Sequence, residues 1–384
     1  MLPIPAHLFD NLISAKLLTT YNAQPPVPSL WPEYTSPTTG VWQYFGLPTW
    51  TSGFFPATFY ALHERSILCP RLGLDEKAWL SRGRASSTGE LPLLNRSGLD
   101  HDVGFMSYPF MDEIRMNPAN KTAAQAVIGL GADLASLFNP VVGCTRSWIN
   151  KPGVDPTVFQ VIIDNMMNLE LLFAAEALTG NRTLRDIAVS HADTTIKHHF
   201  RDDGSTFHLV EYNSTNGAVI ERVTSQGYAD WSAWSRGQSW AIFGYANMFK
   251  HTGFQRYLDT ARHASSYWIA NTPATGIIPW DFNAPSGPYI ADTSAAMIAA
   301  NGFLLLAQGE HAVGNVTGAA FYQRYAMNLV NTHSTAFWRP QWQSLLSNGT
   351  VNAPANNNLT GIVYGDYFFV RAGNEMVKQG LVSC

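Results

Sequence analysis

The sequence predicts an all-α fold, in which an inner ring of helices lies inside an outer ring and both form a closed α/α barrel of helical hairpins. Apolar segments of helical length recur along the 384-residue chain, and Gly, Pro and Asn separate them. Two of these segments, residues 158–173 and 294–307, are apolar on nearly every side. Such a helix is buried all round, so it needs a second layer of helices outside it.

Helices are expected along most of the chain, beginning with two N-terminal helices at residues 54–63 and 76–84. The other expected helices span residues 123–138, 158–178, 184–199, 237–250, 255–270, 291–308 and 318–333. Small residues in 294–307 would let neighbouring backbones approach closely. Strand-like residues between 203 and 223 predict short β excursions in the loops. We expect residues 1–384 to form a single barrel domain, because an open four-helix bundle would need fewer, longer helices.

The composition excludes several classes of protein. Lys and Arg number 24 against 28 Asp and Glu, and hydrophobic residues make up 46% of the chain, which argues against disorder. No basic block is present, so we expect no nucleic-acid partner. The least charged long stretch, residues 292–310, contains Asn301 and Gln308 and falls short of the roughly 20 apolar residues of a membrane span. No membrane partner is therefore expected.

Signals of the cellular compartment point in two directions. The cysteines, Cys69, Cys144 and Cys384, permit at most one disulfide and show no metal-binding spacing. Seven Asn-x-Ser/Thr sequons begin at Asn95, Asn120, Asn181, Asn213, Asn315, Asn348 and Asn358. The N-terminal residues lack the basic and then apolar segments of a signal peptide. The sequons favour a secreted glycoprotein, and a cytoplasmic location stays open.

Asp164 is the first candidate for chemistry, because it is expected in the middle of the buried helix at 158–173. Burying a lone carboxylate costs several kcal/mol unless it is paired, hydrogen-bonded or protonated. One interpretation is a structural Asp that caps a neighbouring loop. The other is a carboxyl whose pKa is raised by burial, as a general acid at neutral pH requires. We favour the second interpretation.

Asp102 belongs to a short segment, Asp100-His101-Asp102, that holds two carboxylates and an imidazole. The segment alone has low specificity, since it is also compatible with a turn or a helix N-cap. A second carboxylate near Asp164 would keep one of the two protonated by repulsion between like charges.

Two further segments carry candidate binding residues. The turn that begins at Asp203 is expected to place His208 at a short strand, although a lone His is more often structural. If a helix opens near Ser235, Arg236 and Trp240 share one of its faces. Arg236 would then bind a sugar carboxylate in a bidentate fork and the indole would stack on the ring. A cation–π pair that joins two helices explains the same spacing equally well.

Six segments taken in order resemble glycoside hydrolase family 88, the unsaturated glucuronyl hydrolases. They read DHDVGF, IIDNMMNLELLFAA, DGSTFH, TSQGYADWSAWSRGQSWAIFGY, DTSAAMIAA and YGDYFF. The resemblance extends from Trp50 to Phe369 and therefore covers most of the chain. It implies an (α/α)₆ barrel of six helical hairpins, in agreement with the two layers of helices expected above. The sequons and the low charge suggest a fungal member.

The resemblance implies an uncommon reaction for a glycosidase. The substrate is an oligosaccharide released by a polysaccharide lyase, with a 4,5-unsaturated uronic acid at its non-reducing end. The vinyl ether is protonated at C4 and water adds at C5, after which the hemiketal opens and the remaining saccharide leaves. The resemblance implies neither a metal nor an organic cofactor. We expect a monomer or a weak homodimer.

The resemblance also assigns roles to individual residues. Asp164 matches the general acid/base, and Asp102 matches a second active-site aspartate that tunes Asp164 and contacts sugar hydroxyls. The positions that match substrate-binding residues are His208, Gln226, Arg236, Trp240, Trp50 and Trp234. Asp292 and Asp366 fall in similar strings, and we interpret both as structural carboxylates at a helix end or a loop.

Three other functions compete with this one. An unsaturated rhamnogalacturonyl hydrolase would use the same barrel and the same hydration on pectin fragments. A non-catalytic glycan-binding barrel would be expected to lose Asp102 or Asp164, and both are present. A helical scaffold for protein partners predicts exposed charged ridges, which the 14% content of charged residues does not favour.

Overall fold

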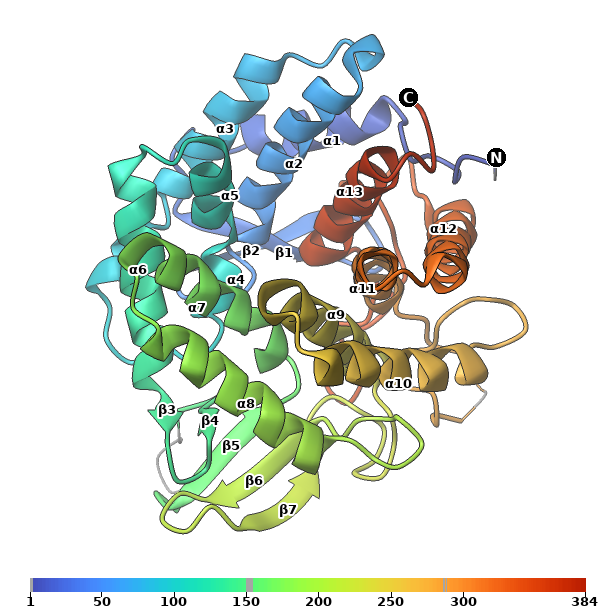
Figure 1. The fold of residues 1–384 in the computed structure, drawn as a ribbon. Coiled ribbons are helices and arrows are strands. Elements are labelled where there is room, and N and C mark those ends of the chain that lie inside the picture. Colours follow the sequence, from blue (N-terminus) through green and yellow to red (C-terminus); the bar gives the residue numbers. More distant parts are fainter. Residues whose placement is uncertain (1–2, 150–154, 286, 288) are drawn as a thin grey trace.

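A computed structural model of the chain describes residues 3–149, 155–285, 287 and 289–384. Helices form most of this structure, and the strands are short and gathered in small sheets (Figure 1). The helices are α1 (Leu12–Asn22), α2 (Phe54–Leu68), α3 (Glu76–Thr88), α4 (Val103–Met106), α5 (Tyr108–Met116), α6 (Lys121–Ser136), α7 (Asn165–Thr179), α8 (Thr183–His199), α9 (Ser235–Thr252), α10 (Gln255–Asn271), α11 (Thr293–Ala312), α12 (Val316–Phe337) and α13 (Val363–Lys378). The strands are β1 (Leu30–Thr35), β2 (Trp42–Gly46), β3 (Phe138–Asn139), β4 (Cys144–Thr145), β5 (Val158–Ile162), β6 (Leu209–Asn213) and β7 (Val219–Val223).

The helices alternate between an outer and an inner ring along the chain. The inner ring contains α2, α5 with the short α4, α7, α9, α11 and α13, and it closes where α13 packs against α2 (Figure 1). Each inner helix follows an outer helix, which gives the pairs α1/α2, α3/α5, α6/α7, α8/α9, α10/α11 and α12/α13. The described residues thus form the (α/α)₆ barrel that the sequence predicts. In this part of the chain, no helix combines the length and the apolar character that a membrane crossing requires.

The inner helix α11 confirms that the small residues of 294–307 permit close packing. Nearly all of its side chains are buried, including Ala295, Ala299 and Phe303. At Gly302 an added Cβ would lie 3.0 Å from the backbone nitrogen of Phe243 in α9. The absence of a side chain at this position therefore lets the two inner helices approach each other.

The prediction of one helix over 158–178 is wrong in its first part. Residues Val158–Ile162 form strand β5, which pairs antiparallel with β6, and helix α7 begins only at Asn165. The physical reason is that a short apolar run rich in Val and Ile suits a buried strand as well as a helix. The β excursions expected between 203 and 223 are confirmed as β6 and β7.

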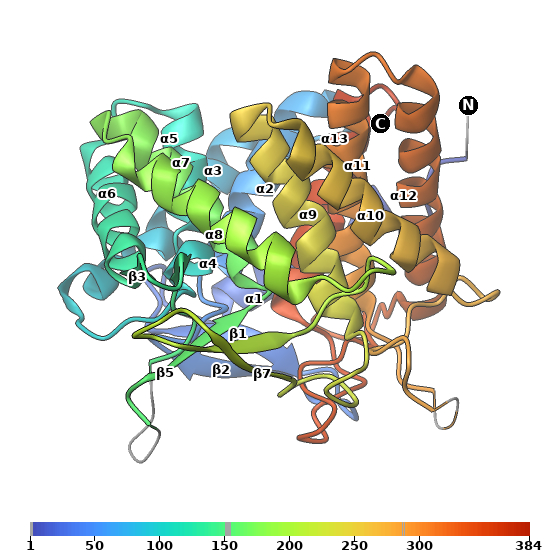
Figure 2. The same cartoon turned by 60° about the horizontal axis from the view of Figure 1, so that its bottom comes forward.

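The strands mark one end of the barrel. Figure 2 shows β1, β2, β5 and β7 below the helices, at the end where α7 begins directly after β5. Helices α9, α11 and α13 follow loops at this same end and run away from it. The N-termini of these inner helices and the connecting loops therefore surround one opening of the barrel.

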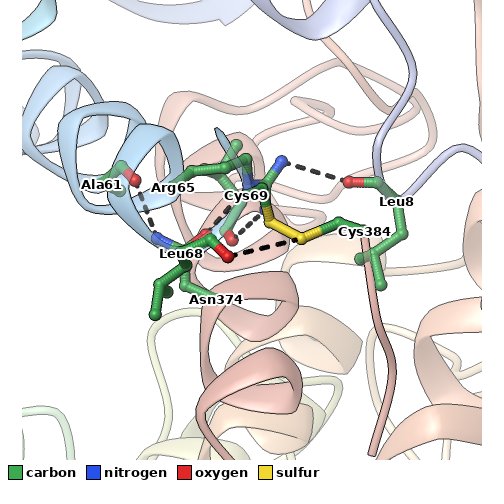
Figure 3. Close-up of a disulfide and its surroundings, with 8 residues drawn as sticks. Leu8, Ala61, Arg65, Leu68, Cys69, Asn374 and Cys384 are labelled. Atoms are coloured by element: carbon green, nitrogen blue, oxygen red, sulfur yellow. Dashed lines mark hydrogen bonds between the residues drawn. A yellow bond between two sulfur atoms is a disulfide. The ribbon is translucent and has the colours of Figure 1, made fainter. Parts of the chain in front are cut away.

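A disulfide and a buried arginine tie the two ends of the chain to helix α2. Cys69, which follows α2, is bonded to Cys384 (Figure 3). Arg65 donates to the carbonyl oxygens of Leu8 (3.1 Å) and Val370 (2.6 Å) and to Oδ1 of Asn374 (2.9 Å). The N-terminal segment, α2 and α13 are thereby held together where the inner ring closes.

Candidate active site

A cavity of ≈ 220 Å³ opens at the strand-bearing end of the barrel. Five of the predicted site residues line it, namely Trp50, Asp102, Asp164, Gln226 and Arg236. Its wall also contains Trp148, Ile162, Val351 and Asn352. A larger cavity of ≈ 660 Å³ lies near the other ends of α7 and α9 and contains none of the predicted residues. The smaller cavity, called the pocket below, is therefore the candidate active site.

Asp164 lies between strand β5 and helix α7, rather than in the middle of a helix as the sequence suggests. Its side chain makes no capping hydrogen bond, and the buried Oδ2 atom has no hydrogen-bond partner. Burial raises the pKa of Asp164 to about 7, against the opposite effects of the Arg236 charge and the Trp240 indole N–H. A carboxyl with this pKa can both give and take a proton near neutral pH.

His208 is brought to Asp164 by the register of the small sheet. Ile162 in β5 pairs with Leu209 in β6, and the next backbone bond runs from the Ile163 N–H to the His208 carbonyl oxygen at 3.0 Å. Asp164 follows directly in the chain, so His208 Nε2 lies 4.0 Å from Asp164 Oδ2. Only the strand pairing, which the sequence did not predict for residues 158–162, explains this contact.

The hydrogen bonds of His208 determine which of its nitrogens carries the proton. The backbone N–H of Ser225 donates to Nδ1 at 3.2 Å, so Nδ1 is the acceptor and the neutral ring has its proton on Nε2. Burial lowers the pKa of His208 to about 3. At neutral pH, an uncharged imidazole therefore presents its N–H to the Asp164 carboxyl.

Asp102 lies at the start of α4 and supplies the second carboxyl of the pocket. Its backbone N–H donates to Asp100 Oδ1 at 3.0 Å, and its Oδ1 lies 3.6 Å from His101 Nε2. Burial, together with repulsion from Asp100, Asp164 and Glu33, raises the pKa of Asp102 well above its usual range. Asp102 therefore remains protonated at pH values where an exposed aspartate is charged.

Arg236 is held by acceptors of the protein itself. Nη1 donates to Asp292 Oδ2 at 2.7 Å and to the Thr350 carbonyl oxygen. Nη2 donates to Gln226 Oε1 and to the Val351 carbonyl oxygen, both at 2.7 Å. These bonds use the four terminal N–H groups of the five on a guanidinium. The arrangement favours an Arg236 that fixes the pocket walls, and its role as a carboxylate clamp stays a prediction.

The aromatic partners of Arg236 differ from the expected one. Its guanidinium lies 4.5 Å from the ring centroid of Trp234 and 5.6 Å from that of Tyr364, so these two rings are its cation–π partners. Although Arg236 and Trp240 are one helical turn apart, Trp240 is fully buried and packs against Phe105 and Phe368. Helix α9 does begin at Ser235, as expected.

The three predicted tryptophans occupy two depths around the pocket. Trp50 lines it, with its ring 4.9 Å from that of Tyr364. Trp234 and Trp240 lie behind the wall and are buried, and Trp234 packs on His208 at 4.6 Å between ring centroids. His208 is 3% exposed, so it also belongs to this second layer.

Asp292 and Asp366, which we expected to be structural carboxylates, have that role in the structure. Asp292 accepts hydrogen bonds from the Ser294 and Ala295 N–H groups at the start of α11, and it also pairs with Arg236. Asp366 accepts from the Leu345 N–H at 2.8 Å and fixes a loop. Outside residues 1–2, 150–154, 286 and 288, no three His, Cys, Asp or Glu side chains are grouped as metal ligands.

Trp148 and Asn352 are pocket residues that the sequence analysis did not identify. Trp148 follows β4 and falls outside every quoted segment, and Asn352 lies in the long loop before α13. An aromatic residue beside a polar loop carries no spacing signal of its own. Only the closing of the barrel brings these loops to Asp164.

Comparison with known proteins places this geometry in a family, although no family model matches the chain. An unsaturated glucuronyl hydrolase of Formosa agariphila is 34% identical over 343 residues, which are 87% of this chain and 80% of that protein. An unsaturated glucuronyl hydrolase of a Bacillus species is 30% identical over 67% of each chain. An unsaturated chondroitin disaccharide hydrolase of Streptococcus pneumoniae is 27% identical over 84% of this chain and 80% of its own.

Solved structures show the same fold. The crystal structure of an unsaturated glucuronyl hydrolase specific for heparin matches with a TM-score of 0.86 and 27% identity, over 98% of each chain. A second one, from a Bacillus species, matches with a TM-score of 0.85 at 22% identity, over 96% of this chain and 95% of its own.

These findings support the glucuronyl branch and give no support to the rhamnogalacturonyl alternative. The relatives are bacterial, so they also give no support to a fungal origin. With 34% identity over most of its length and the same (α/α)₆ barrel, the chain belongs to the unsaturated glucuronyl hydrolases, a family of glycoside hydrolases.

Proposed function

We propose that Asp164 is the general acid/base with which this unsaturated glucuronyl hydrolase hydrates the C4=C5 bond of a terminal unsaturated uronic acid. The observation that carries the proposal is the Asp164 carboxyl itself. Its Oδ2 is buried in the pocket wall without a partner, and burial raises its pKa to about 7. Near neutral pH, Asp164 is therefore protonated in a large fraction of the enzyme molecules. No hydrogen bond between Oδ2 and the protein has to break before the proton is transferred.

The reaction consumes one water molecule and breaks the glycosidic linkage indirectly. Asp164 transfers its proton to C4, and the positive charge that develops at C5 is shared with the ring oxygen. Water adds at C5 and returns a proton to the Asp164 carboxylate, which gives a hemiketal. The ring opens to a C5 ketone, the hemiacetal at C1 collapses to an aldehyde, and the remaining saccharide leaves as an alcohol.

Two neighbouring side chains support the transfer of a proton from and to Asp164. The Nε2–H of neutral His208 faces Asp164 Oδ2 at 4.0 Å, so it stabilises the carboxylate that forms after proton transfer. Asp102 lines the same pocket with a raised pKa, and in this protonated state it can donate a hydrogen bond to a sugar hydroxyl. The proposed roles therefore follow from the different protonation states of two carboxyls and one imidazole.

The remaining predicted residues form the walls that hold the sugar. Trp50 offers an aromatic surface to the pocket, and the side chains of Gln226 and Arg236 line the wall beside it. Trp234 packs against the guanidinium of Arg236 from behind the wall, and Trp240 is buried behind the wall as well. The substrate carboxylate would reach Arg236 only if Gln226 or a loop carbonyl oxygen gave up its bond.

The proposed substrates are unsaturated oligosaccharides from glycosaminoglycans. One relative is named for chondroitin disaccharide and one solved structure for heparin. The assay therefore includes unsaturated disaccharides from both polymers. The test follows the ultraviolet absorbance of the C4=C5 bond conjugated to the carboxylate, which hydration removes. Loss of the signal with unsaturated chondroitin or heparin disaccharide supports the proposal. Loss only with an unsaturated rhamnogalacturonan disaccharide would contradict it.

We also propose that the protein is secreted, N-glycosylated and eukaryotic, as its sequons suggest. The Cys69–Cys384 disulfide supports this, because such bonds persist in oxidising compartments. Among the sequons, Asn95, Asn181 and Asn315 are exposed. A shift in mass on treatment with an N-glycosidase tests the proposal.

The single catalytic domain and the oligomeric state stay predictions. One cluster of buried apolar residues extends from Leu8 to Val382, which supports a single domain. Sedimentation at two protein concentrations tests for a monomer or a weak homodimer.

A further inference from the structure

Trp231 is the one exposed tryptophan of this protein. The sequence contains 12 Trp, all within the described ranges, and among them Trp231 is the one with most of its surface in solvent, at 63%. Tyr228 beside it is 46% exposed, and the two rings meet at 89° with their centroids 6.2 Å apart. Two large aromatic side chains thus stand together in solvent, where they gain little from burial.

The loop that carries these rings is firmly braced. The backbone N–H of Tyr228 donates to Asp281 Oδ2 at 2.9 Å, and Ser232 Oγ donates to the same oxygen at 2.6 Å. Arg201 donates to the carbonyl oxygens of Asp230 and Ser232. Trp231 is therefore presented to solvent by a fixed backbone.

One end of this loop lines the pocket and the other end lies buried behind the pocket wall. At one end Gln226 lines the pocket, and the Ser225 N–H holds His208. At the other end Trp234 packs on His208 and under the guanidinium of Arg236. Tyr228 is two residues from Gln226, which places their Cα atoms within about 7 Å. The loop that carries the exposed aromatic pair therefore starts at the wall of the pocket.

The size of the pocket limits how much substrate it encloses. Its ≈ 220 Å³ is below the roughly 300–1,000 Å³ of pockets that enclose drug-sized ligands, so it suits one sugar ring. The reaction needs only the terminal uronate inside. The saccharide that leaves must therefore extend across the surface outside the mouth.

We propose that Trp231 and Tyr228 form a stacking platform for the leaving saccharide beyond its first sugar, so that this enzyme binds unsaturated tetrasaccharides more tightly than disaccharides. The inference rests on the proposed function and adds the preferred length of the substrate. The faces of pyranose rings carry C–H bonds, which pack on the flat face of an indole at little entropic cost to the protein. The corner between the two perpendicular rings holds one sugar face and one edge.

The experiment compares KM and kcat on an unsaturated chondroitin disaccharide and tetrasaccharide for wild type and Trp231→Ala. We expect the substitution to raise KM for the tetrasaccharide about fivefold, the size of one aromatic contact, with a much smaller rise for the disaccharide. The kcat should not change, because Trp231 is outside the pocket. Trp231→Phe should retain most of the tetrasaccharide affinity.

The control is Phe321→Ala, which removes another exposed aromatic ring (44% exposed) on the outer helix α12. It should leave both KM values as in wild type. If Trp231→Ala has equal effects on both substrates, or none on the tetrasaccharide, the platform is refuted while the proposed function stands. If wild type consumes neither substrate nor their heparin counterparts, the proposed function itself fails.

Discussion

His208 presents the N–H of its Nε2 to Asp164 Oδ2 across 4.0 Å, because its Nδ1 accepts a hydrogen bond from the backbone of Ser225. The tautomer is therefore fixed by the main chain. The distance exceeds that of a hydrogen bond, and neither atom has another hydrogen-bond partner. This pairing of a buried neutral imidazole with a buried carboxyl is the central feature of the pocket.

Replacement of Asp164 by Asn should abolish turnover while the fold persists. The amide cannot transfer a proton, and general acid–base catalysis contributes about 10²–10⁴-fold. We expect kcat to fall by at least this factor, measured as loss of absorbance of the unsaturated disaccharide. The circular dichroism of the variant should match that of wild type. Turnover near the wild-type rate would show that another group donates the proton.

The activity should depend on the protonation of Asp164. Because the acid must be protonated, kcat/KM should fall as the pH rises through about 7, the pKa of Asp164. Trp240→Phe removes the indole N–H that lowers this pKa, so the falling limb should move to higher pH. The pH dependence of kcat/KM, recorded for both proteins, checks the shift. If kcat/KM falls at the same pH in both, the Trp240 N–H does not affect the pKa of Asp164.

The raised pKa of Asp164 should also make the free energy of unfolding depend on pH. The folded pKa of Asp164 is raised from 3.8 to about 7, so its contribution is fully present below pH 3.8 and is lost as the pH rises through 7. Asp164→Asn has no such loss. Its free energy of unfolding relative to wild type should therefore increase from acidic to mildly alkaline pH. Urea titrations at several pH values measure this difference, and a constant difference would contradict the raised pKa.

Loss of Arg236 should destabilise the protein as well as weaken substrate binding. Arg236 is 2% exposed and Asp292 is fully buried, and removing one partner of a buried ion pair costs about 3–5 kcal/mol. Arg236→Ala should lower the free energy of unfolding by this amount and raise KM. The double variant Arg236→Met/Asp292→Asn should recover much of the stability without restoring KM. A collapse of kcat at unchanged KM would instead assign Arg236 to the transition state.

The disulfide should stabilise the barrel without affecting the pocket. Removal of the Cys69–Cys384 bond by a double Ser substitution should cost about 2–4 kcal/mol, mainly through the unfolded chain. Cys69 follows the C-terminal end of the 15-residue helix α2, which is about 20 Å from the start of that helix near Trp50, so KM and kcat should persist below the melting temperature. Cys144→Ser is the control, since Cys144 is not in the disulfide. A double Ser variant with the melting temperature of wild type would contradict this assignment.

The sequence predicted the barrel because burial patterns are local. Segment 294–307 is apolar all round, and it forms the buried inner helix α11. Segment 158–173 shows the limit of the same argument, since its first residues form β5. Period and composition alone could not separate a short buried strand from a helix, because the partner strand β6 lies almost fifty residues away.

The chain by itself thus determined the ring of helical hairpins, the family and the two carboxyls, which are all written in residue types and their order. Only the tertiary structure decided that Asp164 faces His208, that Asp292 and two loop carbonyl oxygens hold Arg236, and that Cys69 meets Cys384. Each of these contacts joins segments far apart in sequence. Their partners are chosen when the barrel closes and buried polar groups must find one another, and no local pattern records that choice.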